Sequence, residues 1–210
     1  MEIILVRHGE NKANITKEYS YKIVDYSLTA KGVRQAIQVA HCLQQYCIDQ
    51  LLSSPLLRAK ETAAYIASAV NVNVAIEEDL REINVGHLDG LVANEENRQR
   101  FFAVINEWNQ GNLEKRFPGG ESGRELRDRF CRVVQKVATE HDGIVVLVGH
   151  AGIFTNGVMA LCQITDFTRL TARYDNCSIS KIAVDQSVEG HRYRLVSWND
   201  TNHLLDEPES

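Results

Sequence analysis

Short apolar runs alternate with amphipathic stretches along most of the chain. The runs that predict strands are residues 3–6, 49–55, 73–77 and 143–148, the second of which ends in a Ser-Pro break. Each is too short to form a helix. Between them, apolar side chains recur at helical spacing, as at Val33, Ile37 and Ala40. This alternation predicts a mostly parallel sheet covered by helices.

Capping residues indicate where several helices begin. Thr29 is a candidate N-cap for the first long helix. Ser122 with Glu125 forms a capping box for a later helix. Further helices are predicted over residues 57–70 and 151–159.

Two segments depart from this alternation. Residues 11–27 are polar without clear periodicity, so we predict a loop there. Near the C-terminus, Ser178–Asp185 and Tyr193–Trp198 are strand-like and are joined by a short turn around Gly190. We expect them to pair antiparallel at the edge of the sheet. The elements together predict a three-layer α/β/α sandwich with a mostly parallel sheet and an antiparallel edge.

The length of the chain suits one domain. We predict a single domain over residues 1–210. Residues 91–121 are polar and carry an aromatic set, Phe101, Phe102 and Trp108, and the first part of this segment is predicted to be helical. The segment is longer than an ordinary connection between a strand and a helix. We therefore expect it to be an inserted cover over one end of the sheet.

Charge and cysteine usage narrow the class of protein. A net charge of −5 argues against a general nucleic-acid binder. No apolar stretch approaches the length needed to span a membrane, and no signal peptide precedes the first strand. The five cysteines are odd in number and lack C-x-x-C spacing, which favours reduced thiols. We expect a cytoplasmic protein that binds neither nucleic acid nor membrane.

Cationic and imidazole side chains follow three of the predicted strands. Arg7 and His8 end the first strand, Arg58 lies about one helical turn beyond the second, and His150 ends the fourth. Because ligands bind at the carboxyl ends of strands in open α/β sheets, we expect these four residues to share one site. Guanidinium groups match phosphate oxygens, and N–H groups at a helix N-terminus add donors. The sequence therefore predicts a phosphoryl site.

The motifs that are missing narrow the chemistry of that site. There is no P-loop and no G-x-G-x-x-G, no obvious carboxylate cluster for Mg²⁺, and no zinc-type histidine spacing. We therefore expect neither a metal nor a cofactor. Phosphoryl transfer to a side chain remains, and a neutral histidine is a suitable nucleophile whose neutral form nearby cations favour. The leaving alkoxide then needs a general acid, for which a carboxyl group is the first candidate.

At Arg7-His8-Gly9-Glu10 the chain resembles the histidine phosphatase superfamily, the phosphoglycerate mutase-like proteins with an R-H-G signature. Further motifs of that family follow in the expected order over nearly the whole length. The matching segments are Arg7–Glu10 with Asn14, Leu28–Gly32 with Gln35-Ala36, Ser53–Ala59 with Thr62-Ala63, Leu80–Ile83 with Gly86 and Gly90, Pro118–Ser122, Val148–Gly152, and Asn199–Thr201 with His203-Leu204.

The resemblance implies a role for each candidate residue. His8 would be the nucleophile that carries a phosphohistidine, and Glu82 would protonate the leaving oxygen and later activate water. The side chains that would surround the phosphoryl group are Arg7, Asn14, Arg58 and His150. The resemblance thus implies a phosphoglycerate mutase-like fold and a metal-independent phosphatase that acts on a small phosphorylated metabolite.

The chain departs from the family pattern at three places. Asn11 stands where threonine is usual, Asn84 replaces a frequent aspartate, and residues 86–90 lack the common tryptophan. None of these changes removes a candidate catalytic residue. The chain also lacks the long insertion that similar mutases carry after their glutamate, which favours a phosphatase. Two alternatives stay open, namely mutase-type phosphotransfer and an inactive module that binds a phosphorylated ligand.

Some of these residues also have a simpler interpretation. Asn14 could cap a turn, and His150 could be a buried core histidine. His203 is expected to help order the C-terminus. The sequence predicts no role for Glu10.

Overall fold

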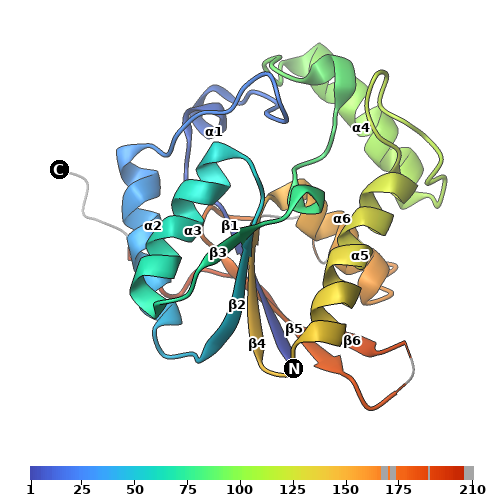
Figure 1. The fold of residues 1–210 in the computed structure, drawn as a ribbon. Coiled ribbons are helices and arrows are strands. Elements are labelled where there is room, and N and C mark those ends of the chain that lie inside the picture. The colour runs from blue at the N-terminus through green and yellow to red at the C-terminus, as the bar shows by residue number, and fades with distance from the viewer. Residues whose placement is uncertain (167–169, 171–173, 189, 206–210) are drawn as a thin grey trace.

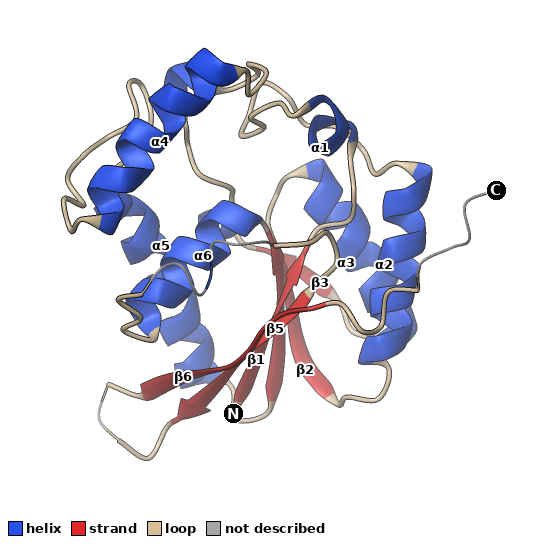
Figure 2. Cartoon of the chain, turned by 180° about the vertical axis from the view of Figure 1, so that it is seen from behind, coloured by secondary structure: helices blue, strands red, loops and turns tan. Residues whose placement is uncertain are grey.

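A six-stranded sheet forms the centre of the molecule (Figures 1 and 2). The computed structural model describes residues 1–166, 170, 174–188 and 190–205. The strands are β1 (Glu2–Arg7), β2 (Ile48–Ser53), β3 (Val74–Ile76), β4 (Ile144–Gly149), β5 (Ile179–Asp185) and β6 (Arg192–Asp200). Their order is β3-β2-β4-β1-β5-β6. The first four pair in parallel, whereas β5 runs antiparallel to both β1 and β6, which confirms the predicted sheet with its antiparallel edge.

Helices cover both faces of this sheet. They are α1 (Lys12–Thr16), α2 (Ala30–Leu43), α3 (Leu57–Val70), α4 (Glu95–Asn109), α5 (Gly123–Glu140) and α6 (Ala151–Leu161), with 3₁₀ turns at Glu78–Leu80 and Gly86–Leu88. Helices α2 and α3 lie on one face, and α5 and α6 lie on the other (Figures 1 and 2). Helices α1 and α4 stand beyond the edge at which β1, β2 and β4 end (Figure 1).

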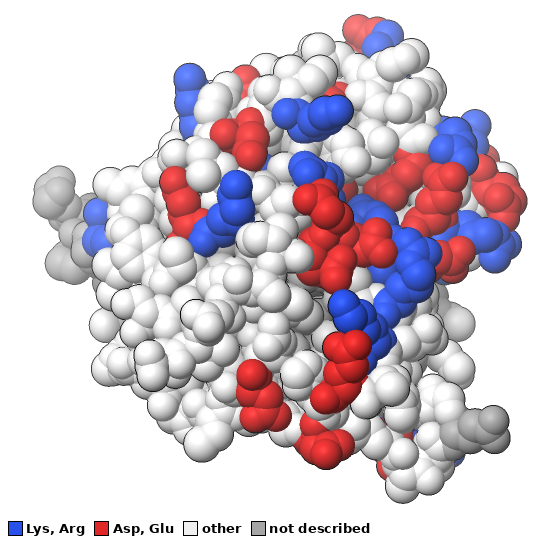
Figure 3. Space-filling model, viewed as in Figure 1, with Lys and Arg blue, Asp and Glu red and all other residues white. Residues whose placement is uncertain are grey.

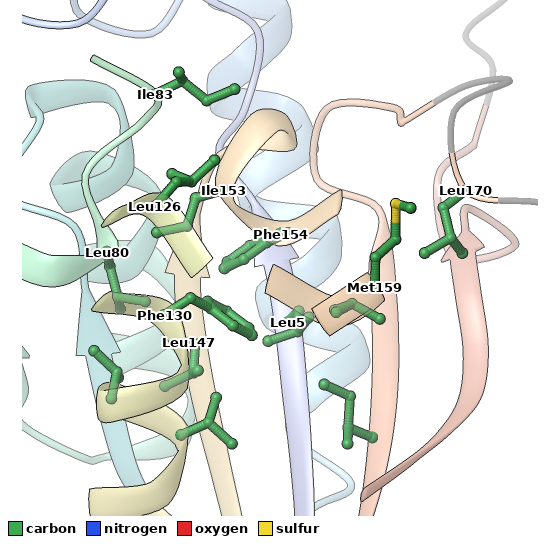
Figure 4. Close-up of a cluster of buried hydrophobic side chains, with 14 of the residues drawn as sticks. Leu5, Leu80, Ile83, Leu126, Phe130, Leu147, Ile153, Phe154, Met159 and Leu170 are labelled. Atoms are coloured by element: carbon green, nitrogen blue, oxygen red, sulfur yellow. The ribbon is translucent and has the colours of Figure 1, made fainter. Parts of the chain in front are cut away.

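The alternation of side chains along β1 divides the core into two parts. Ile4 and Val6 belong to a buried apolar cluster with α2 and α3. Ile3 and Leu5 belong to a second cluster with side chains of α4, α5 and α6. Figure 4 shows part of this second cluster, with Leu5 close to aromatic rings of α5 and α6. Because β1 is covered on both faces, its apolar run is continuous, as in other buried parallel strands.

The prediction of a loop over residues 11–27 is wrong in part, because Lys12–Thr16 form α1. Asn11 and Asn14 cap this helix reciprocally. The Asn11 side chain accepts the Asn14 backbone N–H at 3.1 Å, and the Asn14 side chain accepts the Asn11 N–H at 3.0 Å. A helix of five residues is too short to show an amphipathic period, so the capping pair was its only signal in the sequence.

Glu10 holds the end of β1 against the start of α2. Its carboxylate accepts the Thr29 hydroxyl at 2.9 Å, and its backbone N–H donates to Gln35 Oε1 at 2.9 Å. The two backbones approach so closely that a Cβ added to Gly9 would lie 2.6 Å from the carbonyl oxygen of Gly32. A Cβ on Gly32 would lie 2.0 Å from the Glu10 carbonyl oxygen. These contacts give Glu10 a structural role and fix the position of the loop that follows His8.

Candidate active site

A pocket of about 410 Å³ opens where β1, β2 and β4 end. Five of the six site residues predicted from the sequence line it, namely Arg7, His8, Asn14, Arg58 and Glu82. The sixth, His150, is fully buried beside His8, with 5.1 Å between the two ring centroids. The structure therefore brings all six predicted residues to one place.

The ring of His8 is held in one orientation by two hydrogen bonds. Nδ1 lies 2.8 Å from the carbonyl oxygen of Gly9, which can act only as a hydrogen-bond acceptor. Arg58 Nε–H points at His8 Nε2 from 3.2 Å. A guanidinium has no acceptor, so Nε2 must supply a lone pair to this contact. Both contacts therefore fit the tautomer in which Nδ1 carries the proton and Nε2 carries the lone pair that a nucleophile needs.

The charge state of His8 follows from its surroundings. The side chain is 3% exposed, and burial lowers its pKa well below the usual value for histidine, with Arg58 and Arg7 lowering it further. The ring is therefore neutral at neutral pH, which is the form that can attack an electrophile. The sequence-based expectation that nearby cations keep this ring neutral is confirmed in direction, although burial is the larger cause.

Arg58 is almost completely buried and is held by the loop that follows α1. Its Nη1 donates to the Ser20 hydroxyl at 3.1 Å, and its Nη2 donates to the Ser20 carbonyl at 2.8 Å. Asp25 Oδ1 lies 3.5 Å from Nη1 and also accepts the Leu57 N–H at the start of α3. Burial lowers the pKa of Arg58 to about 10, which leaves the guanidinium charged at neutral pH.

Asp89 orders the loop that supplies these partners. Its two carboxylate oxygens accept the backbone N–H groups of Tyr21, Lys22 and Ile23 at 2.8–2.9 Å. The side chain is 8% exposed. Asp89 thus acts on Arg58 through the backbone next to Ser20. No sequence pattern indicated a role for Ser20, Asp25 or Asp89.

His150 has one ring nitrogen bonded and one without a partner. Nε2 lies 2.8 Å from the hydroxyl oxygen of Ser54, and this oxygen also accepts the Leu56 N–H at 3.3 Å. The hydroxyl proton of Ser54 is therefore available for Nε2, which would leave the proton of the neutral ring on Nδ1. Nδ1 is buried and has no hydrogen-bond partner among the described residues. Burial, with Arg58 second, lowers the pKa of His150 well below its usual value, so this ring is also neutral.

Glu82 lies against the N-terminus of α6. Its Oε1 accepts the N–H groups of Ile83 at 2.9 Å and Ile153 at 3.0 Å, and its Oε2 accepts the Gly152 N–H at 3.0 Å. The donors at the start of α6 are thus occupied by Glu82, in contrast to the expectation that they face a phosphoryl group. A carboxylate offers about four lone-pair directions. Three are used here, and the remaining one is on Oε2.

Charged side chains of both signs intermingle on the surface, and many of them lie near α5 (Figure 3). One ion pair of this helix is instead largely shielded from solvent. Arg129 binds Glu121 through Nε at 3.0 Å and Nη2 at 2.9 Å, and both side chains are 11% exposed. Arg129 also donates to the carbonyl oxygens of Asp79, Arg81 and Glu82 at 2.6, 2.6 and 3.0 Å. These bonds fix the backbone that carries Glu82, and no sequence pattern indicated them.

The segment before β5 holds Arg7 and the backbone of His8. Arg7 Nη1 donates to the Tyr174 carbonyl oxygen, and Asn176 Nδ2 donates to the His8 carbonyl at 3.0 Å. Arg7 Nε is buried and has no partner in the part of the chain that the structure describes. His203 Nε2 lies 2.9 Å from the Cys177 carbonyl oxygen, so the expected role of this histidine in ordering the C-terminal part is confirmed.

The side-chain oxygen of Asn14 is occupied by protein groups. It accepts the Asn11 N–H and, at 3.1 Å, Nδ2 of Asn176. The capping role that the sequence analysis considered for Asn14 is thus present, and only its amide nitrogen is available for a ligand in the pocket. The side-chain nitrogen of Asn11 is buried without a partner and belongs to the same wall.

The described part of the chain contains no group of three or more His, Cys, Asp or Glu residues that could hold a metal ion. Within the same residues, no helix is both long and apolar enough to cross a membrane.

Known proteins resemble this chain in sequence and in structure. It matches the family model of the histidine phosphatase superfamily (branch 1) over residues 3–201. It is 32% identical over 194 residues to "Probable phosphoglycerate mutase GpmB" of Escherichia coli, which covers 90% of this chain and 87% of that protein. A mycobacterial glucosyl-3-phosphoglycerate phosphatase shares the fold, with a TM-score of 0.81 and 24% identity over 95% of this chain and 99% of that one. A phosphoserine phosphatase of Entamoeba histolytica, in complex with 3-phosphoglyceric acid, has a TM-score of 0.80 and 23% identity over 97% and 99% of the two chains.

Arg129→Met should lower the free energy of unfolding by about 3–5 kcal/mol, because it leaves the buried Glu121 carboxylate and three carbonyl oxygens without their donor. Arg132→Met is the matched control. Arg132 lies on the same helix and pairs with Asp79, but its side chain is 62% exposed, so its loss should cost at most about 1 kcal/mol. Urea denaturation measures both values. Equal losses in the two variants would contradict the role given to Arg129.

Stability should fall as the pH drops below about 6.5. Unfolded histidines bind protons near that pH, whereas burial keeps the folded His8 and His150 rings neutral because both pKa values are lowered. The unfolded state therefore binds more protons than the folded state. Each ring should lower the free energy of unfolding by about 1.4 kcal/mol per pH unit below 6.5. In His150→Asn, the free energy of unfolding from urea denaturation should fall less steeply between pH 7 and pH 5 than in the wild type. Parallel slopes would contradict the neutral buried ring.

Proposed function

The chain belongs to the histidine phosphatase superfamily, and on that premise we propose that it hydrolyses small phosphomonoesters through a phosphohistidine intermediate on His8. The observation that carries this proposal is the orientation of His8, with Nδ1 bonded to a carbonyl oxygen and Nε2 left with a lone pair beside Arg58. A neutral ring in that tautomer is the form needed for attack on phosphorus.

In the first step, Nε2 of His8 attacks the phosphorus atom, and the bond from phosphorus to the ester oxygen breaks. Glu82 gives the departing alkoxide the proton it carries at the free position of Oε2, so that an alcohol leaves. In the second step, Glu82 takes a proton from water, whose oxygen attacks phosphorus and breaks the bond to Nε2. The products are the alcohol and inorganic phosphate, and His8 returns to its neutral form.

Three further groups are proposed to bind the phosphoryl oxygens. Arg7 and Arg58 supply positive charge on two sides of His8, and His150 supplies a neutral donor from Nδ1. The unpartnered Nε of Arg7 and Nδ1 of His150 support this assignment, because buried polar atoms normally have a partner. The amide nitrogen of Asn14 is a further proposed contact.

A phosphotransferase of the mutase type remains the second candidate. The name of the Escherichia coli relative supports it. The same residues would serve, but the phosphorylated enzyme would have to be protected from water. An inactive binding module is disfavoured because all the residues that the mechanism needs are present.

His8→Ala should lower kcat for p-nitrophenyl phosphate by about 10⁴-fold or more, because the mechanism has no other nucleophile. His41→Ala, which alters an exposed histidine on α2, is the control and should keep its activity within about twofold. Initial rates from released nitrophenolate measure both. Turnover retained by the His8 variant would rule out the proposed intermediate.

Glu82→Gln should slow the hydrolysis of ethyl phosphate by about 10²-fold to 10⁴-fold, because an alkoxide needs the proton. It should slow p-nitrophenyl phosphate much less, since nitrophenolate leaves without one. Glu78→Gln is the matched control, because Glu78 lies near in the chain and its side chain is 70% exposed. Equal slowing of the two esters by Glu82→Gln would contradict the role of a general acid.

A further inference from the structure

The pocket has two chemically different ends. The phosphoryl end is formed by Arg7, His8 and Arg58, as described above. Another part of the lining is an apolar wall formed by Tyr19, Phe101, Phe102 and Ile105, the last three of which come from α4. We propose, on the basis of the proposed hydrolysis, that the alcohol part of the substrate is an extended apolar group, either aryl or alkyl, that packs on this wall.

The apolar wall is anchored in the core. Phe101 stacks on Tyr19, with 5.2 Å between the ring centroids and 23° between the planes. Behind it, Phe101 contacts Phe117 at 5.4 Å, and Phe117 is fully buried against Trp108. Trp108 is thus core, whereas Phe101 and Phe102 face the pocket. A wall supported in this way is preformed for a ligand, because its rings lose little freedom on binding.

Phe102 is the least explained side chain of this wall. It is 51% exposed and meets Phe101 edge-on, with the centroids 5.5 Å apart. An aromatic ring that stays exposed to water does not gain the favourable free energy of burying its apolar surface. Packing of an apolar ligand against Phe102 would cover this surface.

The charges that line the pocket disfavour a substrate with a second anionic group. Among the described residues that line it, the cations are Arg7 and Arg58, and both lie beside His8. Arg58 already binds Ser20 and Asp25. Glu18 places a carboxylate in the same lining. Against these described residues, a carboxylate or second phosphate on the alcohol would meet apolar rings or a like charge, both of which disfavour its burial.

The test compares kcat/KM for ethyl phosphate, n-hexyl phosphate and 3-phosphoglycerate with the wild-type enzyme. The two alkyl esters have similar leaving groups, so their ratio reports binding of the apolar chain rather than chemistry. We expect n-hexyl phosphate to exceed ethyl phosphate by about tenfold or more, and 3-phosphoglycerate to be no better than ethyl phosphate. A hexyl to ethyl ratio near one, or a preference for 3-phosphoglycerate, would overturn the inference.

Two variants test whether the preference for n-hexyl phosphate depends on the apolar wall. Phe102→Ala should reduce the ratio of hexyl to ethyl by about threefold or more, because it removes most of one apolar ring. Tyr65→Ala is the matched control. Tyr65 is an aromatic residue of α3 that is 37% exposed and lies outside the pocket lining. The ratio of hexyl to ethyl in this variant should equal that of the wild type. An unchanged ratio in Phe102→Ala would contradict the proposed wall.

The proposed function is tested separately in the same assays by His8→Ala. If ester turnover does not depend on His8, the proposed hydrolysis fails. If turnover depends on His8 but shows no apolar preference, hydrolysis stands and only the inference about the alcohol fails.

Discussion

The buried guanidinium group of Arg58 beside the neutral ring of His8 is the interaction on which the rest of the site depends. A charged group in a low-dielectric surrounding is costly unless its donors are bonded. Arg58 is 2% exposed, Ser20 and the lone pair of His8 accept its hydrogen bonds, and Asp25 forms an ion pair with it. The same positive charge and burial keep His8 neutral. A binding site for an anion and a nucleophilic ring thus result from one arrangement.

The segments around the sheet edge act mainly by holding this arrangement. Asp89 fixes the loop of Ser20 through three backbone N–H groups. Arg129 fixes the loop of Glu82 through three carbonyl oxygens. Glu10 ties the end of β1 to α2. Asp89 and Arg129 bond to backbone atoms, whereas Glu10 bonds to the side chains of Thr29 and Gln35. The catalytic groups His8 and Glu82 thus lie on segments that have little regular structure but are well restrained.

Much of the fold and part of the site could be predicted from the sequence for identifiable physical reasons. The apolar runs required buried strands, and the cationic and imidazole side chains at their carboxyl ends, such as Arg7 and His150, had to meet at one edge. Arg129 could not be found in this way, because its acceptors are carbonyl oxygens that any residue supplies. Ser20 and Asp89 share this difficulty, since their contacts are set by loop conformation. Short α1 was missed because its signal was a capping pair of two asparagines rather than a periodic pattern.

The most direct test of the account is the isolation of the phosphorylated enzyme. The protein is mixed rapidly with p-nitrophenyl phosphate, quenched in alkali, digested and analysed by mass spectrometry with assignment of the modified ring nitrogen. We predict one phosphoryl group on the peptide that contains His8, attached to Nε2, and its absence in His8→Ala. A phosphoryl group on another residue or on Nδ1, or turnover with no phosphorylated enzyme at any reaction time, would contradict the account.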